Sequence, residues 1–164
     1  MKDIINIVCD EGATSRVVIG SVEENFESLL PGGTPRIIIV TDAKVHANNL
    51  AFVNAHEHIV IGQGESSKTF VKLEEVYRQL LHMGADRSTF IVGMGGGIVT
   101  DVTGFVASTY MRGVRFGFLP TTLLAQVDAS IGGKNGVNLD GYKNIIGVFN
   151  QPEFVLCDPE LLSS

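Results

Sequence analysis

Two kinds of hydrophobic pattern alternate along the chain. In the first, short runs of mostly β-branched residues stand between polar stretches, which is typical of strands buried in a sheet. In the second, apolar residues recur every three or four positions, which is typical of amphipathic helices. The short runs predict six strands, at residues 5–8, 16–20, 36–40, 58–62, 89–93 and 114–119.

The clearest helical pattern follows the fourth predicted strand. Its apolar positions share three- and four-residue spacing, and Gly84 follows them as a stop signal. These positions are Phe70, Leu73, Val76, Tyr77, Leu80 and Leu81. A second helix is expected to begin at Gly97, with one apolar face. That face is formed by Ile98, Val102, Phe105 and Val106.

Strands that alternate with helices predict an α/β fold, in which helices flank a mostly parallel sheet. The first two strands are close together in the chain, so we expect them to form an antiparallel pair near the N-terminus. Ligands of open parallel sheets bind beyond the carboxyl ends of the strands. The functional residues are therefore expected in the loops that follow Thr41, Ile61, Gly93 and Leu119.

The composition places the chain among globular proteins. Of its 164 residues 45% are hydrophobic and 18% are charged, so it can bury the core of one domain. The longest apolar runs, such as residues 37–40, are too short to span a bilayer, and early acidic residues interrupt any signal-peptide core. Cys9 and Cys157 are isolated, which is typical of reduced, buried thiols in a cytoplasmic protein.

The net charge of −6 argues against nucleic acid as the main partner. Residues 111–150 nevertheless carry a balance of +2, from four cations and two carboxylates. This segment also holds the glycine-dense stretch 128–147, where a backbone free of Cβ atoms can approach a ligand closely. Two interpretations stay open at this point: a site for a small anionic ligand, or a solvated basic surface.

A second glycine-rich loop, "GMGGGIVTD", connects the fifth predicted strand to the second helix. Its triple glycine could present backbone amides and a helix N-terminus to a phosphate group, or it could be a tight structural turn. The loop is not the dinucleotide fingerprint GxGxxG, because Ile98 occupies the last position. Nor is "GGKN" a Walker A loop, which needs Ser or Thr where Asn135 stands.

Several motifs in a fixed order give the chain a specific resemblance. They are "TDAKV", "GESSKT", "GGGIVTDVTGF", "YMRGVRFGFLPTTLLAQVDASIGGKNGVN", "GYKNIIGVFNQP" and "VLCDPELL". From about Arg36 onward the chain resembles the 3-dehydroquinate synthase family of sugar phosphate cyclases. The resemblance implies that residues 1–164 form the Rossmann-like, NAD-binding N-terminal domain of a two-domain enzyme, whose helical C-terminal domain lies outside this chain.

The family chemistry implied by this resemblance uses NAD as a recycled catalyst. The substrate is 3-deoxy-D-arabino-heptulosonate 7-phosphate, a sugar phosphate of the shikimate pathway. Oxidation, phosphate elimination, re-reduction and an intramolecular aldol step convert it to 3-dehydroquinate and phosphate. The family binds Zn²⁺ or Co²⁺ through residues of the C-terminal domain, so the resemblance assigns no metal ligand here and implies that the isolated domain is inactive. It also implies a cytoplasmic homodimer for the full-length enzyme, with no nucleic-acid or membrane partner.

The resemblance further implies two sets of site residues. The catalytic set, on the substrate side, contains Lys134, Asp128, Lys143, Asn144 and Arg112. The cofactor-binding set contains Asp42, Glu65, Lys68, Gly95, Gly96, Gly97, Asp101, Thr121, Thr122, Leu124, Asp128, Lys134, Lys143 and Leu161. In the family the counterpart of Arg112 reaches the phosphate bound by the neighbouring subunit.

Plainer interpretations stand beside several of these roles. Asp42 could be a turn or cap residue, Lys68 could face water at a helix start, and Thr121 or Thr122 could be ordinary N-caps. Arg112 could simply complement a helix dipole. For the whole chain, the alternatives are another sugar phosphate cyclase, with an aminocyclitol or valiolone precursor as product, and a non-catalytic NAD-binding module.

Overall fold

The centre of the protein is a seven-stranded, mostly parallel sheet. The structure, a computed structural model, describes residues 3–8, 14–33 and 35–163. In spatial order the strands are β1 (Asp3–Val8), β2 (Thr14–Ile19), β9 (Phe154–Cys157), β6 (Phe116–Pro120), β5 (Phe90–Gly95), β3 (Ile37–Asp42) and β4 (Glu57–Ile61). The first two strands of this order are antiparallel and all later neighbours are parallel. The predicted fold class and the predicted antiparallel pair are thereby confirmed.

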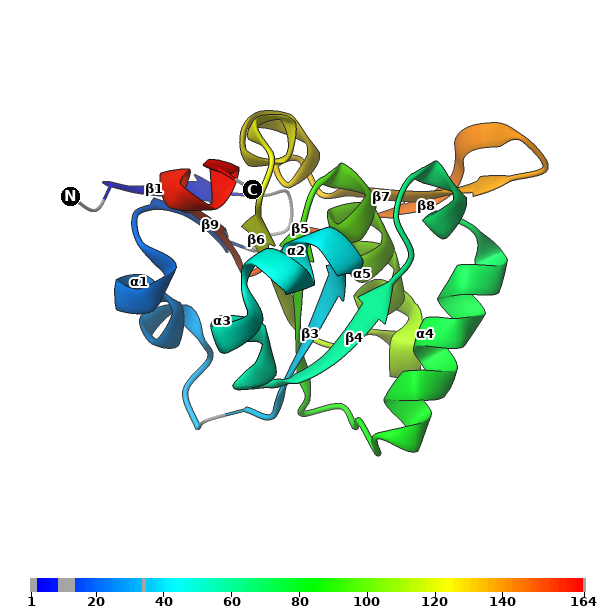
Figure 1. Ribbon diagram of the computed structural model, residues 1–164, viewed down its shortest axis with the longest axis horizontal. Helices are drawn as coiled ribbons and strands as arrows, with labels where there is room; N and C mark the ends of the chain where they lie inside the picture. The colour runs from blue at the N-terminus through cyan, green and yellow to red at the C-terminus, as the bar shows by residue number, and fades with distance from the viewer. Residues whose placement is uncertain (1–2, 9–13, 34, 164) are drawn as a thin grey trace.

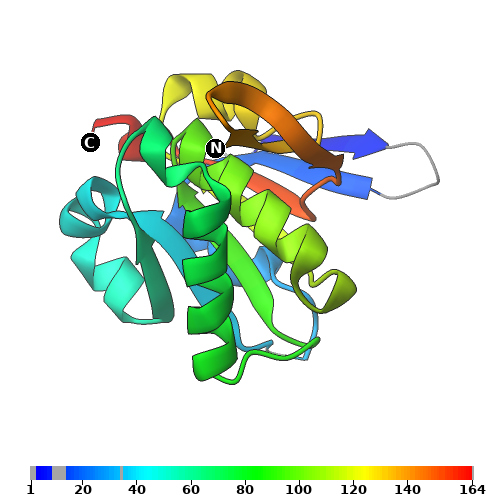
Figure 2. The ribbon, with the colours of Figure 1, turned by 90° about the vertical axis from the view of Figure 1, so that its right-hand side faces the viewer.

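Helices cover both faces of this sheet (Figure 1, Figure 2). One face carries α1 (Val22–Leu29), α2 (Ala43–Asn48) and α3 (Leu50–Asn54), and the other carries α4 (Phe70–His82) and α5 (Gly97–Thr109). Shorter helical turns are η2 (Glu65–Ser67), η3 (Tyr110–Arg112), η4 (Ala125–Ala129, a turn of π-helix) and η5 (Pro159–Ser163). Among the described residues, no helix is long and apolar enough to cross a membrane.

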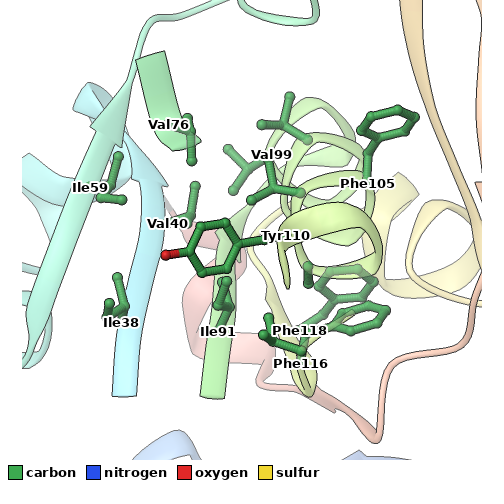
Figure 3. Close-up of a cluster of buried hydrophobic side chains, with 14 of the residues drawn as sticks. Ile38, Val40, Ile59, Val76, Ile91, Val99, Phe105, Tyr110, Phe116 and Phe118 are labelled. Carbon is green, nitrogen blue, oxygen red and sulfur yellow. The ribbon is translucent and has the colours of Figure 1, made fainter. Parts of the chain in front are cut away.

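Side-chain alternation along the strands builds one hydrophobic layer on each face of the sheet. In β3, Ile38 and Val40 belong to the cluster under α4 and α5, whereas Ile39 belongs to the cluster under α1, α2 and α3. Figure 3 shows Ile38 and Val40 on the same side as Val76 of α4 and Val99 of α5. Successive strand residues point to opposite faces, so a strand of continuous apolar residues is buried on both sides.

A β-hairpin outside the main sheet packs on α5. Its strands are β7 (Lys134–Leu139) and β8 (Tyr142–Phe149), which pair antiparallel in a separate two-stranded sheet. Leu139 pairs with Tyr142, so the connection is a two-residue turn with φ of 50° at Asp140 and 82° at Gly141. Positive φ at both central residues is the geometry of a type I′ hairpin turn.

The six predicted strands are confirmed, with ends that shift by at most two residues, but the sequence analysis missed β7, β8 and β9. The stretch 128–147, interpreted above as a ligand-binding loop, contains the end of η4 and most of the hairpin. Cys157 is a buried free thiol as expected, and Cys9 lies outside the described residues.

Both predicted helices form, but the buried face of α4 is narrower than predicted and that of α5 is wider. In α4 the prediction is wrong for Phe70 and Leu81, which are 41% and 63% exposed. Phe70 is the first residue of the helix and Leu81 lies near its end, so both lie outside the stripe formed by Leu73, Val76 and Leu80. In α5 three of the four predicted positions are buried and Ile98, at the margin, is half-buried.

Candidate functional site

Two adjoining hollows lie beside the N-terminal half of α5. The first, the strand-end cleft, has a volume of about 350 Å³ and lies where several parallel strands end. Its lining consists of Asp42, Lys44, Val45, Gly62, Gln63, Gly64, Gly96, Gly97, Ile98, Val99, Thr121 and Thr122. The second, the hairpin pocket, has about 600 Å³ between α5, η4 and the hairpin. Its polar and charged lining consists of Asp101, Asp128, Lys134, Asn135 and Asn144.

The triple-glycine loop forms the floor of the strand-end cleft. β5 ends at Gly95, Gly96 is the N-cap of α5, and no side chain caps the helix there. The first amide groups of a helix have no partner within the helix, so those of α5 can bind an anion, aided by the helix dipole. A Cβ atom on Gly96 would lie 3.1 Å from Cγ2 of Thr122, so a side chain at this position would crowd the cleft.

Asp42 combines two of the roles considered above. It is the last residue of β3 and the N-cap of α2, where its Oδ1 accepts a hydrogen bond of 2.9 Å from the backbone amide of Val45. A carboxylate has a second oxygen, and Asp42 lines the cleft. Capping therefore leaves Asp42 able to accept a hydrogen bond from a ligand hydroxyl.

Two threonines border the cleft on the side of β6. Thr121 is buried and donates its backbone amide to the carbonyl of Gly95 at 2.9 Å, which joins the β6 and β5 loops. Thr122 is exposed, and its Oγ1 accepts from the amide of Ala125 at 3.2 Å, as an N-cap of the helical segment that follows. Both residues therefore hold loop geometry as well as facing the cleft.

The π-helical turn η4 carries Asp128 into the hairpin pocket. Its buried residue Gln126 donates through Nε2 to the carbonyls of Pro120 at 3.2 Å and Asp158 at 3.0 Å. These bonds fix the turn between β6 and the end of β9. π-helical turns occur frequently at functional sites, and this one leaves the Asp128 side chain exposed at the pocket.

Lys68 lines neither hollow, but it is buried behind the hairpin pocket, where it contacts two of the residues that line it. It is only 5% exposed, so it does not face water. Its ammonium group forms an ion pair with Asp101 of α5 and donates to Oδ1 of Asn144 in β8. Burial raises the pKa of the Asp101 carboxyl, and the ammonium of Lys68 opposes that shift. Three segments far apart in the sequence thus meet at one charged group.

The strand-end cleft and the hairpin pocket are neighbours. Gly97 lines the cleft and Ala129 lines the pocket. A Cβ atom on Gly97 would lie 3.4 Å from the Cβ of Ala129, in ordinary van der Waals contact. A long ligand with one end in the cleft can therefore bring its other end beside a second molecule in the pocket.

Some of the expected site residues lie outside both hollows. Lys143 is exposed on β8, and Arg112 is exposed beyond the C-terminal end of α5, away from the triple-glycine loop. Leu124 is 66% exposed, and Leu161 packs against the core on the side of α1 to α3. Glu65 lines neither hollow, but its Oε1 accepts from Nδ2 of Asn138 in β7 at 2.7 Å.

Asn138 is the polar residue of this site that the sequence analysis missed. Its side chain binds both Glu65 and the backbone of the other hairpin strand. The signal that could have found it is "LDGY", because Asp-Gly between two strand-like segments is a strong hairpin signal. A hairpin there would have placed Asn138 opposite the strand that carries Asn144.

Comparison with known proteins identifies the family. Residues 58–164 match the family described as 3-dehydroquinate synthase N-terminal. The chain belongs to this family. The 3-dehydroquinate synthase of Rhodospirillum rubrum is 45% identical over 138 residues, which cover 79% of this chain and 36% of that protein. That of Pyrococcus abyssi is 55% identical over 106 residues, which cover 65% of this chain and 32% of that protein.

A solved structure of 2-deoxy-scyllo-inosose synthase, in complex with carbaglucose-6-phosphate, NAD⁺ and Co²⁺, is also similar. Its TM-score is 0.88 at 27% identity, with 99% of this chain and 47% of that chain covered. This chain therefore shares a fold with cyclases as well as a family with 3-dehydroquinate synthases. It spans about a third of the length of the two synthases above.

Proposed function

We propose that this chain is the NAD-binding, N-terminal domain of a 3-dehydroquinate synthase. That enzyme would convert 3-deoxy-D-arabino-heptulosonate 7-phosphate to 3-dehydroquinate and phosphate. The observation that carries the proposal is that the two hollows have neighbouring lining residues, one hollow being suited to a dinucleotide and the other being lined by both Lys134 and Asp128. Membership of the family supports the choice of reaction.

The strand-end cleft fits NAD through three features of this chain. Uncapped amides at the start of α5 would bind the pyrophosphate. The second oxygen of Asp42 would accept from an adenosine ribose hydroxyl, and its negative charge would disfavour the 2′-phosphate of NADP. Thr121 and Thr122 would border the nicotinamide end. When bound, NAD⁺ accepts a hydride from a hydroxyl-bearing carbon and returns it later.

The hairpin pocket would hold the sugar phosphate. Asp128 would accept hydrogen bonds from substrate hydroxyls, and the ammonium of Lys134 would lie near the departing phosphate. Negative charge concentrates on the phosphate as it leaves, so a fixed ammonium stabilises the transition state more than the ground state. Asn144 would donate to the same anionic molecule, and the exposed Lys143, next to it in β8, would add a further positive charge nearby.

The described residues do not fit a divalent metal by themselves. No group of three or more His, Cys, Asp or Glu side chains in the described part of the chain is placed to hold one ion. A Zn²⁺ or Co²⁺ ion would therefore need ligands from elsewhere in the full native protein. The exposed position of Arg112, outside both hollows, supports a role in the active site of a second subunit, and hence a homodimer.

The test is turnover by the full native polypeptide that contains these residues. With NAD⁺ and a divalent metal, it should release phosphate from the heptulosonate substrate and form 3-dehydroquinate. Lys134→Ala should lower kcat by about 10²-fold or more, the range for loss of one such electrostatic donor. Lys134→Arg should rescue little, because a planar guanidinium does not replace a compact ammonium. NAD⁺ binding, measured by calorimetry, should survive both changes.

Two results would contradict this proposal. A wild-type enzyme that releases no phosphate from this substrate would exclude the reaction. Near-normal turnover by Lys134→Ala would leave Lys134 as a surface lysine, and loss of NAD⁺ binding with an intact fold would move it to the cofactor side.

A second candidate reaction is another sugar phosphate cyclisation. It is favoured by the similarity to 2-deoxy-scyllo-inosose synthase over nearly the whole chain. The same assay separates the two, because this candidate predicts phosphate release from a hexose 6-phosphate and none from the heptulosonate. The higher identity to 3-dehydroquinate synthases is the reason for preferring the first.

A further inference from the structure

The loop between β4 and α4 is fastened to the hairpin by several hydrogen bonds. The backbone amide of Asn138 donates to the carbonyl of Lys68 at 2.9 Å, and Thr69 forms a β-bridge with Asn138. Nδ2 of Asn138 donates to Glu65 at 2.7 Å. The loop therefore holds the middle of β7 through both the backbone and the side chain of one residue.

The same asparagine reaches across to β8. Oδ1 of Asn138 accepts a hydrogen bond of 2.9 Å from the backbone amide of Asn144. Asn144 has a φ of 52°, in the left-handed region that few residues other than glycine adopt, although asparagine is enriched there. Such a conformation persists where its surroundings determine it. Asn138 supplies that constraint on the main chain of Asn144.

The side chain of Asn144 is constrained as well. Its Oδ1 accepts from the ammonium of Lys68, which is buried and ion-paired with Asp101. An ammonium can only donate, whereas a carboxamide has one accepting end and one donating end. The oxygen of the amide must therefore face Lys68, and the NH₂ group is the end left to donate to a molecule in the hairpin pocket.

The hairpin needs such support because little else covers β8. An isolated two-stranded hairpin is marginally stable in water. In β8, Tyr142 is 69%, Ile145 is 59% and Phe149 is 86% exposed. The bonds from the loop between β4 and α4 therefore fix the position of a strand that packing alone holds weakly.

We propose that Asn138 and Lys68 are positioning residues for Asn144, which fix its NH₂ group as a donor to an acceptor oxygen of the pocket ligand. Asn138 sets the main chain of Asn144, and Lys68 sets the orientation of its amide. In the reaction proposed above, on which this inference rests for its ligand, the acceptor is an oxygen of the sugar phosphate. Lys68 thereby acts from behind the pocket, through another residue.

Two variants separate main-chain positioning from donation. Asn138→Ala removes the acceptor of the Asn144 amide, so that amide should exchange with solvent about tenfold faster, as expected for loss of one hydrogen bond. In the full native polypeptide the same variant should raise KM for the heptulosonate substrate about tenfold, while kcat and the Kd of NAD⁺ change less than about twofold. Asn144→Asp keeps the pairing with Lys68 but has no NH₂ group, so it should raise KM equally without faster amide exchange.

Asn48→Ala, an exposed asparagine on α2, is the matched control and should change none of these quantities. A general loss of structure in Asn138→Ala would lower both kcat and the fraction of protein that binds NAD⁺. Loss of positioning would change KM alone. Unchanged exchange, or faster exchange with unchanged KM, would overturn the positioning role of Asn138.

The role of Lys68 has a readout that needs no turnover. In wild-type protein the two side-chain amide protons of Asn144 should give separate NMR signals with contacts to pocket residues. In Lys68→Met these contacts should average over both orientations of the amide. If the full native polypeptide proves inactive, the proposed reaction fails, but this spectrum still decides the inference: unchanged amide contacts in Lys68→Met would overturn it.

Discussion

Asn135 joins the hairpin to α5 through an unusually close contact. The residue is 3% exposed, and its Nδ2 donates to the carbonyls of Gly133 at 3.1 Å and Asn150 at 2.9 Å. A Cβ atom on Gly104 of α5 would overlap the carboxamide of Asn135. Glycine in the middle of a helix costs stability relative to alanine, and here it makes room for the buried amide that fixes the base of the hairpin.

Gly104→Ala should therefore destabilise the protein despite the better helix propensity of alanine. Overpacking of a tight interior typically costs about 1–3 kcal/mol, so urea denaturation should show a loss in this range. Gly32→Ala is the control, because a Cβ atom there meets nothing within 4 Å, and its stability should stay equal or rise slightly. Equal stability of both variants would mean that Asn135 moves aside without cost.

Cys157 makes stability depend on alkaline pH. Burial raises the pKa of its thiol to about 11 from an ordinary value of 9.0. A raised pKa of an acid means that folding favours its neutral form. The contribution of the neutral thiol to the free energy of unfolding is therefore complete below pH 9 and is lost as the pH rises towards 11. A shift of this size corresponds to about 3 kcal/mol, at roughly 1.4 kcal/mol per pKa unit.

Denaturation of a Cys9→Ser protein and of a Cys9→Ser, Cys157→Ala protein measures this contribution. Between pH 9 and pH 11 the first should lose about 3 kcal/mol more than the second. Both proteins contain the same tyrosines, so the titration of the tyrosines cancels in the comparison. Parallel curves of unfolding free energy against pH would show that the thiol ionises in the folded protein as easily as in water.

At the scale of elements, the hairpin depends on its two-residue turn. Gly141 has a φ of 82° with nothing within 4 Å of a Cβ atom built there, so backbone strain alone opposes a larger residue. Gly141→Ala should cost about 1–2 kcal/mol of hairpin stability. Gly141→Asn should cost less, because asparagine tolerates this region.

Hydrogen exchange localises that effect. Amides of β7 and β8 should exchange faster in Gly141→Ala, whereas amides of the central strand β5 should keep their wild-type rates. Uniform acceleration in β5 as well would show that the hairpin and the sheet unfold as one unit.

The elements that sequence patterns could predict are those whose environment is uniform. Strands such as β3 and β5 are buried on both faces, so their continuous apolar runs were readable, and so was α5 with its buried face. The hairpin was not predicted, because β8 is mostly exposed and its apolar residues do not alternate regularly with polar ones. The glycines of this segment favoured the interpretation as a ligand-binding loop, and the turn signal at Asp140 and Gly141 was not used to predict a hairpin.

In the candidate site, too, the identity of several residues could be predicted from the sequence, whereas their contacts could not. The resemblance placed Lys68 and Asp101 among the cofactor-binding residues and Asn144 among the catalytic ones, but the contacts of Lys68 with both join positions up to 76 residues apart. Sequence spacing carries no information on such contacts, which depend on how α5, the loop after β4 and the hairpin pack. Asn138 is the last residue of the longest motif quoted above, but the resemblance assigned it no role, and its contacts appear only in the packed hairpin.

For the whole molecule, strand order was beyond the reach of local patterns. β9 enters the sheet between β2 and β6, so the last strand in the chain joins the antiparallel pair to the parallel core. This insertion also brings Asp158, just after β9, to the N-terminus of α1, where its Oδ2 accepts from the amide of Val22 at 2.8 Å. The residue that follows β9 is thereby tied to the start of α1.

The whole chain should bind NAD⁺ without catalysing the proposed reaction. The strand-end cleft is formed entirely by residues described here, whereas these residues offer no group of three metal-binding side chains. Calorimetry should therefore detect NAD⁺ binding by residues 1–164, tighter than NADP⁺ binding because of Asp42. Gly96→Val should weaken NAD⁺ binding at least about tenfold, because the valine side chain crowds Thr122 and covers the amides of α5. The control Gly32→Val, at a position with open surroundings, should leave NAD⁺ binding unchanged. Phosphate release by the isolated chain on addition of Zn²⁺ would show that it completes the metal site unaided.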